Sequence, residues 1–344
     1  MNIPPADGVR VMPEELRRFA REVLEKVGVP EEHAVLLANT LVETDQRGVL
    51  SHGTQQLLRY TRQFRAGELN PDPQVRVSQE APATAVVDGD GGLGHFAAYR
   101  AVEVALAKAK EMGTAAVVAV NHGHIGAAGT YTRRVLPEGC AALCVSGVDT
   151  RSHRPIGPPR HILQVGAGGP ISFAIPASAE PPLVLDMGCY FSHRPARTRD
   201  REARLQAMRE HLDEVFDVAP DAVFKIMGLG AVTMALGGIL AGVSLPENPD
   251  DDRLYPGANQ GTFLAVFDVA RFMPLDTFLA EMDQFVRKTR SLEPLPGCAE
   301  AELPGGPEWR RERDWATEGI PIGGRHREML EEVAQECGVE LPLP

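Results

Sequence analysis

A histidine that directly follows a serine is the residue pair with the clearest chemical use in this sequence. Ser51 and His52 lie near the end of the segment Asp45-Gln-Arg-Gly-Val-Leu-Ser-His-Gly53, and residues 54–68 have the apolar spacing of a helix. Serine is a common helix N-cap, so we expect Ser51 to open this helix and His52 to lie in its first turn. The helix dipole there lowers the pKa of an imidazole. Since histidine titrates at roughly pH 6.5, His52 is a candidate proton donor and acceptor; the alternative is a simple cap followed by a polar residue.

Two other polar positions follow predicted strands. The segment Asn121-His-Gly-His-Ile-Gly-Ala-Ala-Gly129 comes directly after one apolar run, and Asp186 ends another at 182–185. Side chains at the carboxyl ends of strands line cofactor and substrate sites in α/β proteins. We therefore expect a ligand site here, with Asp186 orienting His52; the alternative is that Asp186 caps a turn. Two histidines one residue apart can also bind a metal, but no carboxylate or cysteine lies near them in the sequence, and we predict no metal site.

A glycine-rich turn between a predicted strand and a predicted helix offers a second interpretation. Gly89-Asp-Gly-Gly-Leu-Gly94 fits the G-x-G-x-x-G pattern of a dinucleotide-binding loop. The pattern is short in a chain with 34 glycines, and no acidic residue stands where the ribose partner is expected. A plain glycine turn explains the motif equally well.

Helical patterns occupy both ends of the sequence, and strand patterns occupy its middle. Apolar spacing predicts helices at 13–27, 31–46, 54–68, 96–112, 275–289 and 325–337. Apolar runs predict strands at 83–87, 115–120, 141–146, 170–176, 182–185 and 262–269. This order, with a break at 70–73, predicts a mixed α/β domain at 79–271 and a discontinuous, mainly helical domain at 1–78 with 272–344.

Three segments need a separate interpretation. Residues 226–243 are almost uncharged and nearly long enough for a membrane span, but they are rich in glycine and alanine and lack aromatic or basic flanks. We predict a buried, closely packed helix rather than a span. The charge-dense stretch 197–214 is typical of a solvated helix, and Asp250–Asp252 of a surface loop.

The composition is that of an ordinary soluble globular protein. Its 344 residues exceed the usual size of a single core, and 43% hydrophobic with 24% charged residues is ordinary for a soluble protein. A formal charge of −12 argues against nucleic acid as a partner. Five cysteines without dense pairing favour free thiols in a reducing compartment, and the N-terminus shows no secretory signal. We therefore expect a cytoplasmic location.

These motifs, in this order, resemble the malate/L-lactate/sulfolactate dehydrogenase family, also called the type 2 lactate dehydrogenase family. The resemblance covers nearly the whole chain. Its segments are the Asp45–Gly53 motif with Tyr60 downstream, the turn at 87–94, Asn121–Gly129, 171–176, Leu185-Asp-Met187, Lys225 with its glycine-rich helix, Glu302-Leu-Pro-Gly-Gly-Pro-Glu308 and Gly319-Ile-Pro-Ile322.

The resemblance implies an NAD- or NADP-dependent oxidoreductase that moves a hydride between nicotinamide and a small 2-hydroxy or 2-oxo acid. It implies a homodimer with a mixed-sheet nicotinamide-binding domain of non-Rossmann type, so that the glycine turn at 89–94 is a decoy. By this resemblance His52 is the proton donor, held by Ser51, with Asp186 as a further catalytic residue. The implied substrate-binding residues are Arg47, Gln56 and His124. The implied cofactor-binding residues are His124, Gly126, Ser146, Asp186, Met187, Lys225, Gly305 and Glu308.

Departures from the family pattern fall on the same positions. Gln56 stands where relatives usually carry an arginine that can clamp a carboxylate, so Arg47, Arg59 or an arginine at 194–204 would have to replace it. Other departures are Ile125, Gly168-Gly-Pro170, Asp186-Met-Gly-Cys-Tyr190 and Val223-Phe-Lys225. Two alternatives therefore stay open: a reductase of cyclic or N-alkyl imino acids, and a relative without redox activity that acts as a dimeric binding protein.

Overall fold

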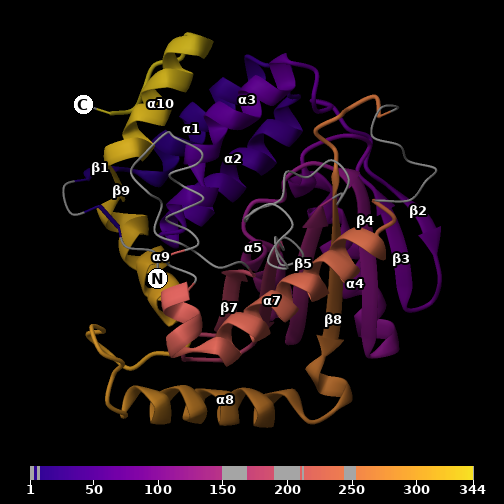
Figure 1. Ribbon diagram of the computed structural model, residues 1–344, viewed down its shortest axis with the longest axis vertical. Helices are drawn as coiled ribbons and strands as arrows, with labels where there is room; N and C mark the ends of the chain where they lie inside the picture. Colours follow the sequence, from indigo (N-terminus) through magenta and orange to yellow (C-terminus); the bar gives the residue numbers. More distant parts are fainter. Residues whose placement is uncertain are drawn as a thin grey trace.

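A seven-stranded mixed sheet forms the middle of the molecule (Figure 1). The computed structural model describes residues 4–5, 8–148, 169–189, 210, 213–243 and 253–343. The strand order is β2 (Arg76–Glu80), β3 (Thr84–Asp88), β4 (Thr114–His122), β8 (Gln260–Asp268), β5 (Cys140–Val148), β6 (Pro170–Ile175) and β7 (Leu183–Gly188). Only β3 and β4 pair in parallel among these strands. A Rossmann domain needs a parallel sheet, so the prediction of a mixed, non-Rossmann sheet is confirmed.

The two faces of the sheet are covered by different helices. Helix α4 (Gly94–Met112) packs alanines such as Ala101 and Ala105 against β4, and Leu264 of β8 belongs to the same core. Alternate residues point to the opposite face. There Val145 and Phe263 pack with Leu236, from the segment that follows helix α7 (Pro220–Met234). That segment, Ala235–Ile239, is a π-helix, and its backbone lies against β5 so closely that a Cβ on Gly147 would be 2.4 Å from the nitrogen of Gly238.

Helices from both ends of the chain share a second core. Its helices are α1 (Pro13–Glu25), α2 (Glu31–Gln46), α3 (Leu57–Arg65), α9 (Gly306–Glu318) and α10 (Gly324–Cys337), with the small sheet β1 (Val9–Val11) and β9 (Ile320–Ile322). Helix α8 (Leu275–Arg290) extends along the edge of the molecule, away from α10 (Figure 1). The helical assembly of N- and C-terminal segments is as expected, while the proposed domain limits at 78 and 272 stay a prediction.

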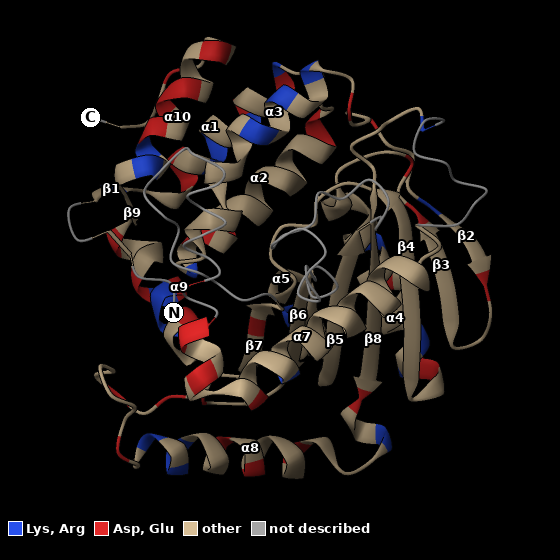
Figure 2. Ribbon diagram, in the orientation of Figure 1, with Lys and Arg blue, Asp and Glu red and all other residues tan. Residues whose placement is uncertain are grey.

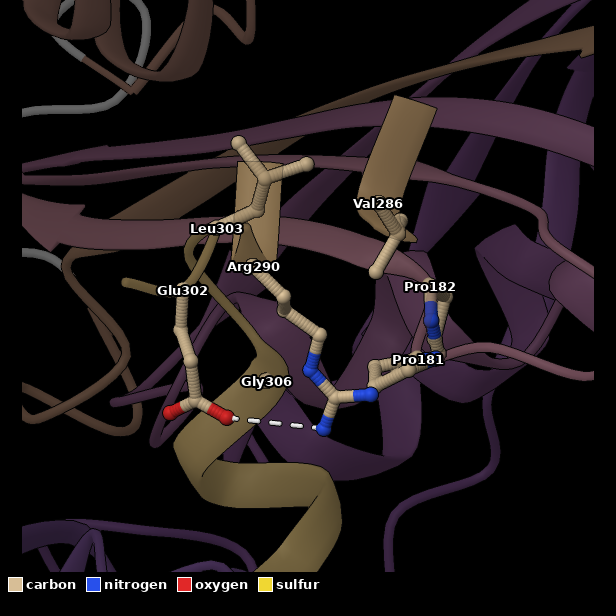
Figure 3. A pocket seen from close by; sticks show the side chains of 7 residues that line it. All are labelled: Pro181, Pro182, Val286, Arg290, Glu302, Leu303 and Gly306. Carbon is tan, nitrogen blue, oxygen red and sulfur yellow. Dashed lines mark ion pairs between the residues drawn. The ribbon is translucent and has the colours of Figure 1, made fainter. Parts of the chain in front are cut away.

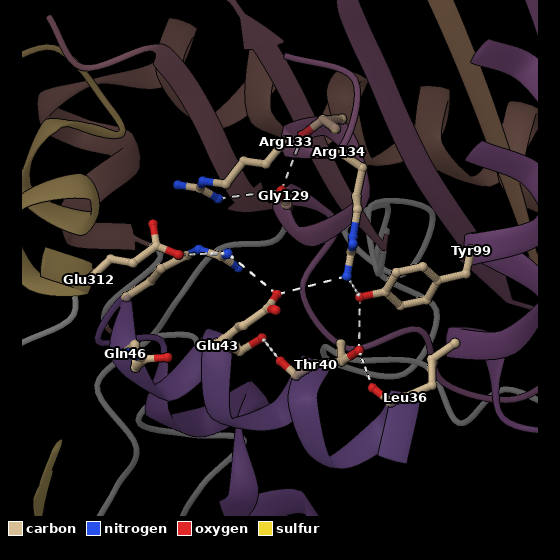
Figure 4. Close-up of polar contacts among 12 residues, drawn as sticks. Leu36, Thr40, Glu43, Gln46, Tyr99, Gly129, Arg133, Arg134 and Glu312 are labelled. Carbon is tan, nitrogen blue, oxygen red and sulfur yellow. Dashed lines mark hydrogen bonds and ion pairs between the residues drawn. The ribbon is translucent and has the colours of Figure 1, made fainter. Parts of the chain in front are cut away.

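A polar chain joins the helical core to the sheet domain (Figure 4). The Thr40 hydroxyl on α2 lies 2.8 Å from the Tyr99 hydroxyl on α4, and Arg134 donates to Tyr99 at 2.6 Å. Arg134 also lies 3.9 Å from the Glu43 carboxylate on α2. Arg134 follows helix α5 (Gly129–Arg133), so this chain fixes α2 beside the segment that begins at Asn121.

Three sequence predictions are corrected. Helix α3 begins at Leu57 rather than Thr54, because 3₁₀ turns at Leu50–His52 and Thr54–Gln56 precede it. The apolar segment at 226–243 packs closely on β5 with one face, as predicted, but it is not fully buried, since Leu229, Val232, Ile239 and Leu240 are exposed. Among the described residues, Pro220–Ile239 is the one helical stretch whose length and composition would suit a membrane span, which is weak support for one. The third correction adds elements that the sequence did not predict: β1, β2, β9, α5 and α9.

Other expectations have mixed outcomes. All five cysteines are free thiols, and four of them are buried. The predicted solvated helix at 197–214 lies mostly outside the described residues, and the predicted loop Asp250–Asp252 lies wholly outside them.

Candidate active site

Two histidines from different parts of the fold face each other. His52 lies in the 3₁₀ turn before α3, and His124 lies in the loop after β4; their ring centroids are 5.7 Å apart. The Ser51 hydroxyl lies 2.9 Å from Nδ1 of His52, so Ser51 holds the imidazole and does not cap a helix. The Tyr60 hydroxyl on α3 lies 2.7 Å from Nδ1 of His124. With the Tyr60 hydroxyl donating, His124 carries its proton on Nε2, whereas the Ser51 hydroxyl can donate to Nδ1 of His52 or accept from it, according to the tautomer of that ring.

Burial keeps both rings neutral near pH 7. Desolvation, followed by the charge of Arg59, lowers the pKa of His52 below its usual value. The same two causes hold the pKa of His124 well below its usual value. Burial raises the pKa of the Tyr60 phenol, so this group stays protonated. The expected direction for the His52 pKa is therefore correct, but the cause is desolvation and a neighbouring guanidinium rather than a helix dipole.

Two more histidines, His122 and His95, are buried near the loop that carries His124. His122 is buried; its Nδ1 lies 2.7 Å from the carbonyl of Gly123, and its Nε2 lies 3.2 Å from the Thr262 hydroxyl. His95 is buried against Tyr60 in an edge-on contact. Desolvation lowers the pKa of His122 to about 4 and the pKa of His95 to about 3, so both are structural neutral rings. No group of three metal-ligating side chains occurs among the described residues.

Asp186 belongs to a second polar cluster, at the end of β7. Its Oδ2 accepts a hydrogen bond from the Gly129 backbone N–H at 2.9 Å. Burial raises the Asp186 pKa, against the opposing effects of that N–H and of Arg133. Desolvation, with the nearby charge of Arg47, lowers the pKa of Arg133 to about 10. Asp186 is hydrogen-bonded to Gly129 and not to His52, so its role in orienting His52 stays a prediction.

The candidate substrate-binding residues differ in whether their polar groups are already paired within the protein. Arg47 is engaged by Glu312 at 2.9 Å and by Glu43 at 3.6 Å (Figure 4). Gln56 donates to the Ser51 carbonyl at 2.6 Å, and its buried Oε1 has no partner in the described structure. Arg59 is exposed and forms no ion pair with a described residue. Residues 194–204 lie outside the described residues, as do Gly168 and Tyr190.

The remaining cofactor candidates are spread over the sheet edge and its surroundings. Gly126 has a φ of +71°, Ser146 donates to the Gly261 carbonyl at 2.9 Å, and Met187 pairs with Ile171 between β7 and β6. Glu308 lies in the first turn of α9. Lys225 is exposed on α7, where it pairs with Asp221 at 3.4 Å.

The segment before α9 is held tightly against β7. Gly305 has a φ of +97°, and a Cβ there would lie 2.7 Å from the Val184 nitrogen, so only glycine fits. The Val184 N–H donates to the Pro304 carbonyl at 2.8 Å. A small pocket beside this segment is lined by Arg290 of α8, whose guanidinium lies 3.8 Å from the Glu302 carboxylate (Figure 3). The structure thus gathers Ser51, His52, Gln56 and His124, and places Asp186 with Gly129 and Arg133.

Comparisons with known proteins agree with this arrangement. The sequence pattern of the family described as malate/L-lactate dehydrogenase matches residues 11–193 and 197–331. The chain belongs to this family. It is 32% identical to a malate dehydrogenase from Pyrococcus horikoshii, over 96% of either chain. It is 25% identical to an NAD(+) ureidoglycolate dehydrogenase from Escherichia coli K12, over 91% of this chain and 93% of that one. The solved structure of the Pyrococcus horikoshii malate dehydrogenase covers 99% of both chains, with a TM-score of 0.80 and 29% identity.

The family assignment makes this chain a dehydrogenase that acts on CH–OH groups. The sequence predicts roles for His52, Ser51 and His124, which stay predictions, and it assigns none to Tyr60 or to Arg133. A sequence signal for Tyr60 was present, because it lies only eight positions after His52, in the predicted helix that follows this histidine.

Proposed function

We propose that this family member is a homodimeric, cytoplasmic NAD(P)-dependent oxidoreductase of small 2-hydroxy and 2-oxo acids, with His52 as its proton donor and acceptor. The observation that carries the proposal is the pairing of His52 with His124, two neutral imidazoles from different parts of the fold, 5.7 Å apart. Neutral imidazole is the form that accepts a proton when an alcohol is oxidised. The malate dehydrogenase relative supports a 2-hydroxy acid as substrate.

The chain offers suitable groups for a nicotinamide dinucleotide. Asp186 uses one oxygen to accept a single backbone N–H, which leaves acceptor capacity for a hydroxyl or amide donor. The glycine at 129 permits close approach of the Asp186 carboxylate to the main chain, since a Cβ there would lie 2.6 Å from Oδ2 of Asp186. We assign cofactor contacts to the residues named above, of which Gly126 lies two positions after His124. When bound, the nicotinamide supplies or accepts the hydride.

The protein's own residues handle the proton and the orientation. In oxidation, the Nδ1–H tautomer of His52 leaves Nε2 free to accept the substrate hydroxyl proton. The Ser51 hydroxyl, 2.9 Å from Nδ1, then accepts from the imidazolium. His124, fixed by Tyr60 at 2.7 Å, presents an Nε2–H that can donate to the same substrate oxygen. In reduction these steps run in the opposite direction.

Arg59 is our candidate for the substrate carboxylate. Gln56, a neutral amide, cannot replace a guanidinium clamp. Arg47 is neutralised by Glu312 and Glu43, at 2.9 and 3.6 Å. Arg59 lacks an ion-pair partner among the described residues, yet its charge lowers the pKa values of both His52 and His124. It therefore has the position and the free charge to bind an anionic substrate beside these rings.

The dimer proposal rests on the outer face of α7 and the π-helix. The chain carries no charged residue from Ile226 to Val243, and the middle of α7 is uncharged in Figure 2. Large apolar side chains are exposed there: Phe224 at 70%, Ile239 at 64% and Leu240 at 58%. A contiguous apolar face of this kind is typical of an interface, and a second copy is the partner that the family resemblance implies.

The test is a cofactor titration followed by a substrate screen. Purified protein is titrated with NADH and NADPH by cofactor fluorescence, and 2-oxo acids are then screened for reduction with and without methylamine. We expect micromolar binding of at least one cofactor and turnover of free 2-oxo acids. Turnover that requires the amine would make the protein an imino acid reductase. No binding at millimolar cofactor would contradict the proposal and favour a non-redox binding protein.

A further inference from the structure

A buried network of three side chains lies behind the segment that carries His52. The Asp45 carboxylate, at the end of α2, accepts from the Thr54 backbone N–H at 3.0 Å and from the Thr54 hydroxyl at 2.5 Å. The same hydroxyl lies 2.9 Å from Nε2 of His326 on α10. None of the three is more than 4% exposed. The network ties together α2, the 3₁₀ turn and α10, and the Ser51–His52 pair lies in the loop that it closes.

The single hydroxyl proton of Thr54 gives the network a direction. Burial raises the pKa of Asp45 to about 7, against the lowering effect of the two bonds from Thr54. In the ionised form of Asp45 this hydroxyl must donate to the carboxylate, so its lone pair is left to accept from His326 Nε2–H. Burial lowers the pKa of His326 to about 4, so the ring is neutral and keeps that one proton. Replacing the hydroxyl with a methyl group therefore breaks two bonds at once, although the Thr54 backbone N–H still donates to Asp45.

The carboxylate also lies against the main chain directly after His52. A Cβ on Gly53 would be 1.8 Å from Oδ1 of Asp45, so no side chain fits at this position while the carboxylate stays in place. Earlier in the same loop, the Gly48 N–H donates to the Asp45 carbonyl at 2.8 Å. The His52 N–H donates to the Val49 carbonyl at 2.9 Å. Asp45 thus contacts the chain before His52, at Gly48, and after it, at Gly53 and Thr54.

This arrangement lowers the free energy of unfolding compared with an apolar core. Oδ1 of Asp45 and Nδ1 of His326 are buried without hydrogen-bond partners in the described structure. A buried polar atom without a partner costs on the order of 1–3 kcal/mol, and apolar side chains of similar volume often pack such a space at no loss of stability. What the polar network adds over an apolar core is direction, because hydrogen bonds fix the positions of the groups that they join.

We propose that Asp45, Thr54 and His326 are positioning residues that hold the loop at 47–53 so that the His52 imidazole stays beside His124. The inference rests on the proposed role of His52 and deepens it. Small displacements of a reacting group can reduce turnover by as much as roughly 100-fold. Loss of the network should therefore lower kcat and leave substrate and cofactor binding nearly unchanged.

The test compares Thr54→Val, which removes the hydroxyl, with Thr54→Ser, which keeps it. We expect Thr54→Val to lower kcat by about 10-fold or more, with KM and the NADH dissociation constant changed by less than about twofold. Thr54→Ser should restore most of kcat. The matched control is Thr44→Val. Thr44, on α2, is buried like Thr54, but its hydroxyl donates only within its own helix, to the Thr40 carbonyl at 2.7 Å. This control should keep wild-type kcat.

A second readout is independent of turnover. The imidazole NMR signals of His52, identified as those lost in His52→Asn, should move in Thr54→Val and stay in place in Thr44→Val. Wild-type kcat and unmoved signals in Thr54→Val would overturn the inference. The inference would also be overturned if Thr54→Val lowers kcat, raises KM and lowers the thermal midpoint together, and Thr54→Ser restores none of them. Such a result would mark a purely structural role. Full activity of His52→Asn would instead remove the proposed function, which separates the two failures.

Discussion

The Tyr60 hydroxyl lies 2.7 Å from Nδ1 of His124, so a helix of the N-terminal region fixes an imidazole that follows a strand of the sheet. Tyr60 is completely buried, and burial raises its pKa, so the phenol keeps the proton that it donates. This bond selects the Nε2–H tautomer of His124 and turns it toward His52. The candidate site therefore exists only where the two parts of the fold meet.

Tyr60→Phe should weaken catalysis with little effect on the fold. The change removes one hydrogen bond, worth about 1 kcal/mol to stability, and frees the His124 ring to adopt the other tautomer. We expect kcat to fall by roughly 10-fold, which corresponds to about 1.4 kcal/mol in the barrier, with cofactor binding retained. Steady-state kinetics measure this, and an unchanged kcat would show that the tautomer of His124 has no role.

Arg59→Gln should raise KM for 2-oxo acids by about 10-fold or more, because a charge-assisted contact to the substrate carboxylate is lost. Arg18→Gln is the matched control, since Arg18 is, like Arg59, an exposed arginine, but it lies on α1 and is not part of the site. Adding Gln56→Arg to Arg59→Gln should recover part of the affinity. If Arg59→Gln leaves KM at its wild-type value, the carboxylate binds elsewhere.

The pH profile of alcohol oxidation should show the depressed pKa of His52. Neutral imidazole is the active base, and desolvation with the charge of Arg59 lowers its pKa. Oxidation should therefore be flat through neutral pH and decline only below the usual histidine range. Removing the Arg59 charge should move this acidic limb to higher pH. A limb that stays in place in Arg59→Gln would mean that the limb reports another group.

The apolar face of α7 should control the oligomeric state. Phe224→Glu introduces a charge on a side chain that is 70% exposed, and it should convert a dimer to a monomer. Met112→Glu, at a 54% exposed apolar residue on α4, should leave the dimer intact. Light scattering after size-exclusion chromatography gives the mass of each variant. A wild-type monomer, or a dimer that survives Phe224→Glu, would reject this interface.

Local patterns predicted those elements whose stability comes from their own apolar face. Helix α2 has the predicted limits, 31–46, because its buried residues recur at helical spacing before Gly48, whose φ is +79°. Strands β4 and β5 were also found, since they are continuous apolar runs. The edge strand β2 was missed because charged and polar residues cover both of its faces, with four of its five residues exposed.

Features that depend on distant partners were out of reach. Strand β1 exists only through pairing with β9, where Val9 lies opposite Ile322. The start of α3 was predicted too early because the 3₁₀ turn at Thr54 is held by Asp45 and by His326, 272 positions further along the chain. The positioning network could not be predicted for the same reason, although Asp45 and Gly53 are the first and last residues of the Asp45–Gly53 motif.

The most direct test of the central claim is the turnover of His52→Asn, measured together with its cofactor affinity. Asparagine retains a polar side chain of similar reach but cannot exchange a proton near pH 7. With the best 2-oxo acid from the screen, we predict that kcat falls by roughly 100-fold or more while the NADH or NADPH dissociation constant stays within about twofold of wild type. Wild-type turnover by His52→Asn would contradict the account, because His52 could not then be the proton donor.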